Sequence, residues 1–167
     1  MHNYFTRVAT KNDVELINTL AQKIWRTYYP SIISNQQIEY MLAKMYSTED
    51  LLKQMTAEAH CFVLCFADNQ PVGYCSYSCQ QVGHYFLHKL YVDTTQHHRG
   101  IGSWFLSTVL DVLTDLQYLR LTVNRKNFKA INFYFKNKFI IEEVKDFDIG
   151  EGFWMKDFVM VYKRVDN

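Results

Sequence analysis

Two glycines separated by one residue, Gly100 and Gly102, lie between an apolar run that ends at Val92 and a helical pattern that begins near Ile101. Glycines at such a junction let the backbone turn tightly and approach a ligand. The free N–H groups of the first helical turn and the helix dipole then favour an anion, and a diphosphate fits this chemistry. Arg99 adds a guanidinium suited to phosphate oxygens. The alternative is a loop whose glycines serve turn geometry alone.

A second group that can do chemistry is the phenol of Tyr134, on a helix predicted over Asn127–Lys136. Asn127 can cap this helix. Ala130, Phe133 and Tyr134 are three and four residues apart and therefore share one face. A phenol is protonated at pH 7 and can donate its proton. The alternative is an ordinary core tyrosine.

Strands and helices must position these residues, and the apolar periodicity predicts where they lie. Capping patterns at Thr10 with Asp13 and at Ser34 with Gln37 mark two helix starts, and Pro30 ends or interrupts the first helix. The predicted order is β-αα(α)-βββ-α-β-α-ββ, an α/β (α+β) class with a mixed, mostly antiparallel sheet flanked by helices. The predicted strands are Tyr4–Val8, Cys61–Ala67, Val72–Gln80, Tyr85–Val92, Tyr118–Val123, Phe139–Phe147 and Phe153–Tyr162.

The composition limits the classes of protein to which this chain can belong. The 167 residues suit one domain spanning 1–167, and 49% hydrophobic residues supply ample core. A net charge of +1 argues against nucleic-acid binding. The N-terminus lacks a secretory pattern and no apolar run approaches ~18 residues, so we expect a cytoplasmic protein without a membrane segment. The glycine segment matches neither a dinucleotide fingerprint nor a Walker A loop.

The glycine segment resembles the acetyl-CoA signature of the GNAT acetyltransferase superfamily, Gln/Arg-x-x-Gly-x-Gly/Ala. His97, Gly100 and Gly102 match it, with histidine in the first position. Leu87–Val92 is similar to the family's pantetheine-lining strand. Lys138 stands where many members have glycine, which predicts a different turn there because a non-glycine residue disfavours positive φ.

The downstream helix carries the second part of the resemblance. Asn127, Ala130 and Tyr134 match the family's Asn-x-x-Ala…Tyr pattern. Asp146–Met160 is similar to the C-terminal hairpin of a bacterial subgroup that includes polyamine N-acetyltransferases. The resemblance is strong over about Tyr85–Lys163 and looser before it, and it implies the GNAT acyl-CoA N-acyltransferase fold.

The activity implied by the resemblance is transfer of acetyl from acetyl-CoA to a primary amine of a small molecule, with a polyamine favoured. The diphosphate would bind the backbone from Arg99 to Ser103, and the pantetheine arm would pair with Leu90 to Val92 like an added strand. A backbone N–H there would polarise the thioester carbonyl, and Tyr134 would protonate the departing thiolate. The residues expected to contact the cofactor are Leu90, Tyr91, Val92, His97, His98, Arg99, Gly100, Ile101, Gly102, Ser103, Asn127, Ala130 and Tyr134.

The candidates for the general base are His84, His88 and a chain of water molecules. Asp68, in a turn, is the only carboxylate from Cys61 to Val92. His88 has the strand parity of Leu90, which predicts that it points toward the same site, and imidazole suits proton uptake near neutral pH. The alternative is a half-buried strand residue without a catalytic role.

Four aromatic residues are expected to line the acceptor site: Trp25, Tyr28, Tyr29 and Phe153. The alternative places them in the core or on the surface. The acidic residues of Glu142–Asp157 would attract a cationic amine, or else form a solvated strand face. A peptide or protein N-acetyltransferase and a non-catalytic acyl-CoA-binding module are the alternative functions. A homodimer is compatible with the sequence.

The four cysteines form two pairs, Cys61 with Cys65 and Cys75 with Cys79, on neighbouring predicted strands. Residues four apart on a strand are roughly 13 Å distant, too far for ligands of one zinc ion. We therefore expect no metal site, and predict free thiols that serve as small buried apolar residues.

Overall fold

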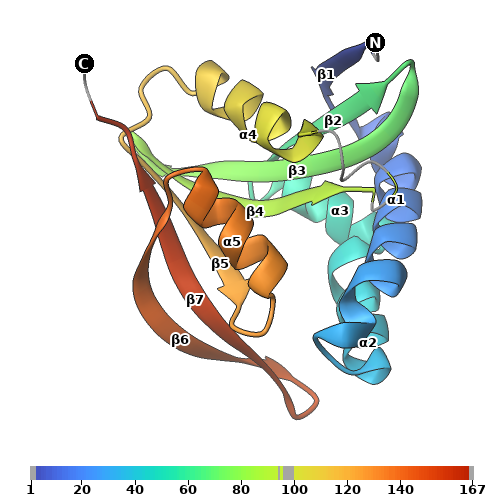
Figure 1. The fold of residues 1–167 in the computed structure, drawn as a ribbon. Coiled ribbons are helices and arrows are strands. Elements are labelled where there is room, and N and C mark those ends of the chain that lie inside the picture. The colour runs from blue at the N-terminus through green and yellow to red at the C-terminus, as the bar shows by residue number, and fades with distance from the viewer. Residues whose placement is uncertain (1–2, 94, 96–99, 166–167) are drawn as a thin grey trace.

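A computed structural model describes residues 3–93, 95 and 100–165, which form one seven-stranded sheet with helices on both faces (Figure 1). The strand order is β1-β2-β3-β4-β5-β7-β6, and only β4 and β5 pair in parallel. The predicted class and order of elements are confirmed. The strands are β1 (Tyr4–Val8), β2 (Cys61–Ala67), β3 (Gln70–Gln81), β4 (His84–Val92), β5 (Tyr118–Asn124), β6 (Ile140–Gly150) and β7 (Phe153–Lys163). The helices are α1 (Val14–Tyr28), α2 (Asn35–Tyr46), α3 (Thr48–Thr56), α4 (Ile101–Val112) and α5 (Phe128–Lys136), with 3₁₀ turns η1 (Lys11–Asp13) and η2 (Tyr29–Ser31).

The first two helices begin at the polar residues that mark their starts in the sequence. Asp13 accepts a hydrogen bond from the backbone N–H of Thr10 at 2.7 Å and completes a capping box at η1, which leads into α1. The Ser34 hydroxyl caps α2 by accepting the N–H of Gln37. Pro30 lies in η2, directly after the end of α1. The predicted capping sites are therefore confirmed.

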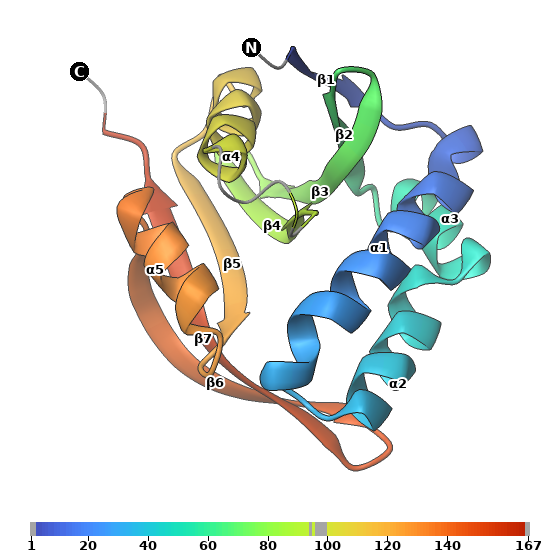
Figure 2. The same ribbon diagram turned by 45° about the vertical axis from the view of Figure 1, so that its right-hand side comes forward.

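Two hydrophobic cores lie on opposite faces of the sheet, because side chains alternate along each strand. On β2, Val63 and Cys65 enter the core beneath α4 and α5, whereas Phe62 and Leu64 enter the core beneath α1, α2 and α3. Figure 2 shows the two groups of helices on either side of the sheet. The sheet therefore lies between α1, on one face, and α5, on the other.

The parallel pair β4–β5 is short, and the two strands separate along their length (Figure 2). Pairing covers only His84 to Phe86 of β4 against Tyr118 to Arg120 of β5. From Leu87 to Tyr91, the β4 edge that faces β5 has no strand partner among the described residues. Backbone amides on that edge are therefore free to bind a ligand.

A β-bulge at His88 changes which side chains of β4 face each core. Tyr77 of β3 pairs with Leu87 and Ser76 pairs with Lys89, so His88 has no cross-strand partner. Before the bulge Leu87 enters the α4/α5 core, and after it Leu90 does so, although three positions separate them. The extra residue has thus reversed the parity of the strand.

The turn after α5 differs from the prediction. Lys138 has φ 68°, the left-handed conformation that a glycine would adopt, so the expectation of a different turn is wrong. The N–H of Phe139 donates to the carbonyl of Tyr134 at 3.0 Å and closes the helix end as a Schellman motif does. Burial of Phe139 in the core stabilises the turn in spite of the strained lysine.

The four cysteines are free thiols, but they do not share one environment. Cys65 and Cys75 are buried as predicted, Cys61 is half-buried, and Cys79 is exposed, contrary to the prediction. Within the described residues, no group of three or more His, Cys, Asp or Glu side chains is placed to hold a metal ion. Nor is any helix of this part of the chain long and apolar enough to cross a membrane.

Candidate active site

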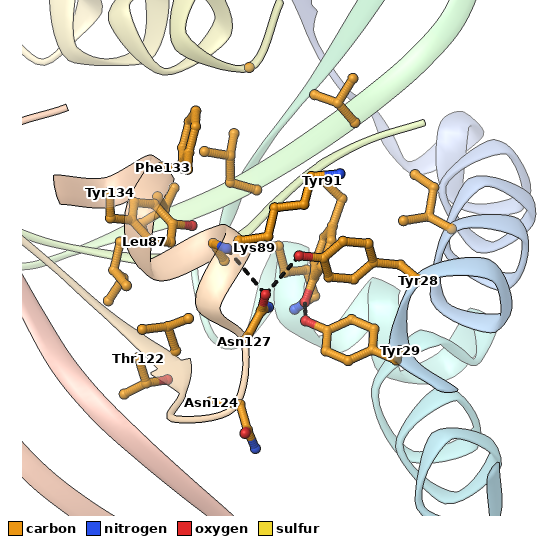
Figure 3. A pocket seen from close by; sticks show the side chains of 18 of the residues that line it. Tyr28, Tyr29, Leu87, Lys89, Tyr91, Thr122, Asn124, Asn127, Phe133 and Tyr134 are labelled. Atoms are coloured by element: carbon orange, nitrogen blue, oxygen red, sulfur yellow. Dashed lines mark hydrogen bonds between the residues drawn. The ribbon is translucent and has the colours of Figure 1, made fainter. Parts of the chain in front are cut away.

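A cavity of about 600 Å³ opens where β4 and β5 separate. Its walls come from α1, η2 and α2 on one side, α5 on the other, β4 and β5 behind, and the start of α4 and the first half of β7 at its ends. Figure 3 shows Tyr28 and Tyr29 facing Asn127 and the residues of α5 across this space. Both sequence motifs singled out above therefore border one cavity.

The N-terminus of α4 reaches the cavity through Gly100, Gly102 and Ser103. Gly100 precedes the helix with φ 67°, and no side chain among the described residues caps it. The first turn therefore keeps free N–H groups at the positive end of the helix dipole. A Cβ at Gly100 would meet no atom of the described residues within 4 Å, so this part of the structure leaves space beside the turn. The free backbone N–H groups of this turn are suitable donors to a diphosphate.

Three residues of the expected phosphate site, His97, His98 and Arg99, lie outside the described residues. Ile101 is 1% exposed and belongs to the core, so only its backbone is available to a ligand. The structure thus places the backbone part of the expected site, from Gly100 to Ser103, at the cavity.

Contacts between α4 and α5 fix the two motifs relative to each other. A Cβ on Gly102 would approach the ring of Phe133 to 3.2 Å, so glycine permits close packing of the helices. The side-chain amide of Asn137 donates to the Ser103 hydroxyl at 3.2 Å. The glycine turn and the tyrosine helix are therefore one packed unit.

The end of β4 forms the back of the cavity, where Leu90, Tyr91 and Val92 line it, and its edge lacks a strand partner among the described residues up to Tyr91. Because this edge lacks a strand partner within the described residues, its N–H and C=O groups can pair with an extended chain that carries amides. The pantetheine arm of coenzyme A is such a chain. The strand therefore fits the role predicted for it.

Asn127 links α5 to α1 across the cavity (Figure 3). Its Oδ1 accepts the backbone N–H of Ala130 at 3.2 Å, which confirms the predicted helix cap. The same oxygen accepts the hydroxyl of Tyr28 at 2.7 Å. A salt bridge between Lys23 and Asp93 ties α1 to the end of β4. These contacts hold the aromatic end of α1 against the site.

Four tyrosines, Tyr28, Tyr29, Tyr91 and Tyr134, line the cavity from four elements, α1, η2, β4 and α5. The hydroxyls of Tyr29 and Tyr91 are 3.2 Å apart. The hydroxyl of Tyr134 has no hydrogen-bond partner among the described residues, while its ring packs on Phe133 and Phe139. Burial raises the pKa of Tyr134 far above the ordinary value for a phenol. Its hydroxyl is therefore a proton donor that stays protonated throughout the usual pH range.

The bulge removes the strand parity between His88 and Leu90, although His88 is among the residues that line the cavity. The His88 ring stacks on His60 at 3.7 Å, and its Nε2 is 2.7 Å from the Ser78 hydroxyl. Burial, then repulsion from the neighbouring cations, lowers the pKa of His88 to about 3. Such an imidazole is a weak base. The other candidate, His84, packs on Tyr118 and does not line the cavity.

The predicted acceptor residues separate into two groups. Trp25, Tyr28 and Tyr29 line the cavity, and Trp25 is also part of the core. Phe153 packs against Tyr40 of α2 and is not among the lining residues.

The acidic stretch of the C-terminal hairpin is mostly a solvated strand face. Glu142 pairs with Arg120, and Asp146 pairs with Arg125. Of the acidic residues in this stretch, only Asp157 lines the cavity, and it is 3% exposed. Charge alone does not distinguish Asp157 in the sequence from the exposed acidic residues of the same stretch. The signal that could have separated it is its place in the alternating row of apolar residues along β7.

Lys89 is a second residue that sequence reasoning missed. Its Nζ donates to Gln54 at 2.6 Å and lies 5.5 Å from the ring centres of both Tyr46 and Phe62. Burial lowers the pKa of Lys89 to about 8. Its contacts hold the bulged part of β4 to α3 and the aromatic core.

Comparison with known proteins gives similarity over nearly the whole chain. The model of the acetyltransferase (GNAT) family matches residues 18–139. A spermidine N(1)-acetyltransferase of Thermoplasma acidophilum is 28% identical over 142 residues, which cover 81% of this chain and 88% of that protein. The crystal structure of the PaiA N-acetyltransferase from T. acidophilum in complex with coenzyme A is 26% identical, has a TM-score of 0.80, and covers 97% of this chain and 99% of its own. A GCN5-related N-acetyltransferase from Rhodopseudomonas palustris shares the fold, with a TM-score of 0.81 at 14% identity over 98% of each chain.

Proposed function

The chain belongs to the acetyltransferase (GNAT) family, and on that basis we propose that it acetylates a primary amine of a small molecule, with a polyamine as the favoured acceptor. Enzymes of this family use acetyl-CoA, so the protein is an acetyl-CoA-dependent N-acetyltransferase. The T. acidophilum relative named as a spermidine N(1)-acetyltransferase supports the polyamine class. A cavity of about 600 Å³ lies in the size range of small-ligand sites.

One observation carries the proposal: the β4 edge from Leu87 to Tyr91 and the Tyr134 hydroxyl border the same cavity, and neither has a pairing partner among the described residues. Acetyl-CoA supplies a thioester whose acyl group is activated for transfer. The first-turn amides of α4 would hold the diphosphate, and Leu90 to Val92 would hold the pantetheine amides. A backbone N–H on this edge would stabilise negative charge that develops on the carbonyl oxygen.

Tyr134 acts as the general acid in this proposal. Its pKa, raised by burial, keeps the phenol protonated at neutral pH. It can therefore give a proton to the sulfur that leaves as the amide forms. Because the phenol is neutral, this role requires no buried charged side chain. Asn127 would support the site indirectly, because its oxygen holds both Tyr28 and the start of α5 in place.

The test is release of free thiol from acetyl-CoA in the presence of spermidine, spermine, amino acids, aminoglycosides and short peptides. We expect turnover with the polyamines and little with the peptides, because the cavity walls formed by Tyr28 and Tyr29 leave a confined space. Preference for the peptides would instead favour a peptide or protein acetyltransferase. Binding of acetyl-CoA without thiol release with any amine would favour a non-catalytic binding module.

A further inference from the structure

Asp157 is a buried carboxylate that the proposed mechanism has not used. It lies on β7 opposite Asn124 of β5 and Lys145 of β6, and it lines the cavity. Asp157 is 3% exposed, and its Oδ1 is buried without a hydrogen-bond partner among the described residues. A buried acceptor without a hydrogen-bond donor lowers the stability of the folded protein, so its presence in the structure calls for an explanation.

Among the described residues, no cation is paired with Asp157 alone. Arg125, beyond the end of β5, is bonded to Asp146 of β6, so the two charges largely offset each other at Asp157. Lys145, opposite on β6, is exposed, with its Nζ 5.5 Å from the ring centre of Phe147. On the cavity side the interacting group is the neutral phenol of Tyr29. Burial raises the pKa of Asp157 to about 6, opposed by a hydrogen bond from Thr122 and by Arg125.

We propose that Asp157 receives the ammonium group of the acceptor and takes a proton from it, which makes the nitrogen able to attack. This assignment rests on the proposed function and names the base for the same site. The ammonium supplies the donor that Oδ1 lacks. The aromatic rings of Trp25, Tyr28 and Tyr29, which line the same cavity, are favourable surroundings for a cation.

The protons balance in this scheme. The ammonium, with three protons, gives the first to Asp157 and becomes a neutral amine. Its nitrogen forms a bond to the acyl carbon, the carbon–sulfur bond breaks, and the sulfur takes the proton of Tyr134. The nitrogen passes its second proton to the Tyr134 oxygen and keeps the third in the amide. Asp157 then releases its proton to solvent, so one proton is produced in each turnover.

The assignment predicts a preference for amines that are charged in solution. A carboxylate in a low-dielectric site attracts an ammonium strongly and is a better proton acceptor than an exposed carboxylate. The rate in the parent protein should fall as Asp157 becomes protonated at low pH. Without the carboxylate, the reaction depends on the small fraction of amine that is already neutral, and that fraction grows tenfold with each pH unit.

The experiment compares the parent protein, Asp157→Asn, Asp157→Glu and a control, Asp111→Asn, with spermidine and saturating acetyl-CoA from pH 5 to 10. Asp111 is an exposed carboxylate on α4. In Asp157→Asn we expect kcat/KM for the amine to fall about 10²-fold to 10³-fold at pH 7. The fall of the parent's rate below about pH 6 should be absent, and the rate should keep rising toward pH 10. Asp157→Glu should keep an acidic fall, and Asp111→Asn should match the parent.

Affinity for coenzyme A, measured by calorimetry, shows whether each variant is folded and should stay within about twofold of the parent. If Asp157→Asn keeps the parent's rate and the acidic fall, the assignment of Asp157 is wrong while the proposed function stands. If only KM rises and the pH profile is unchanged, Asp157 is not the base. If the parent protein transfers acetyl to no amine, the proposed function is wrong, and this assignment fails with it.

Discussion

Replacement of Tyr134 by phenylalanine tests the proposed mechanism most directly. The substitution removes one hydroxyl that has no hydrogen-bond partner among the described residues, and it keeps the ring that packs on Phe133 and Phe139 at centroid distances of 5.2 and 5.3 Å. The free energy of unfolding should therefore change by less than about 0.5 kcal/mol, because no protein contact is lost. Affinity for coenzyme A should also be retained.

Turnover should respond very differently from stability. Loss of a general acid lowers the rate by about 10² to 10⁴, equivalent to about 3–5 kcal/mol in the activation free energy. Because burial places the pKa of Tyr134 far above the assay range, the phenol is protonated at every pH tested. The loss should therefore be uniform between pH 6 and 9, with no change in the shape of the profile.

Single-turnover thiol release with acetyl-CoA and the best acceptor is the appropriate assay, since it isolates the chemical step from product release. Tyr162→Phe is the matched control, because Tyr162 packs on Phe139 from β7 and does not line the cavity. It should keep the parent's rate. A Tyr134→Phe protein whose single-turnover rate is within threefold of the parent's would refute the role of this hydroxyl.

Three further predictions concern stability and are checked by urea unfolding. Lys138→Gly should raise the free energy of unfolding by about 1 kcal/mol, because glycine adopts φ 68° without steric cost, and an unchanged or lower value would contradict this. Asn127→Ala should lower it by about 1–2 kcal/mol, since the cap of α5 and the acceptor for Tyr28 are both lost, whereas Asn127→Asp should recover most of the loss. The pKa of Asp157 is raised from 3.8 to about 6, so the folded state holds a proton in that window which the unfolded state releases, and stability falls as pH rises through it. The parent should therefore lose about 2 kcal/mol between pH 4 and 7 that Asp157→Asn does not lose, and parallel curves for the two proteins would show that the carboxyl is not perturbed.

Much of the fold could be predicted from the sequence because it depends on short-range patterns. The caps at Thr10 and Ser34 act within a few residues and are present as predicted, and the apolar runs lie in the predicted strands. The glycine junction at Gly100 likewise indicated a helix start next to a strand. The order of elements followed from these local signals, and the resemblance then supplied the cofactor and the class of reaction.

The composition of the site was decided by the tertiary structure. One extra residue at the β4 bulge removed the strand parity between His88 and Leu90, and the sequence carries no mark of such an insertion. Tyr28 and Asn127 are 99 residues apart, so only the packing of α1 across the open edge of β4 brings them into contact. Asp157 looks like its exposed neighbours in the sequence, yet pairing between β5 and β7 buries it at the cavity. Local energies determine which elements form, whereas strand register and the separation of β4 from β5 determine which side chains meet.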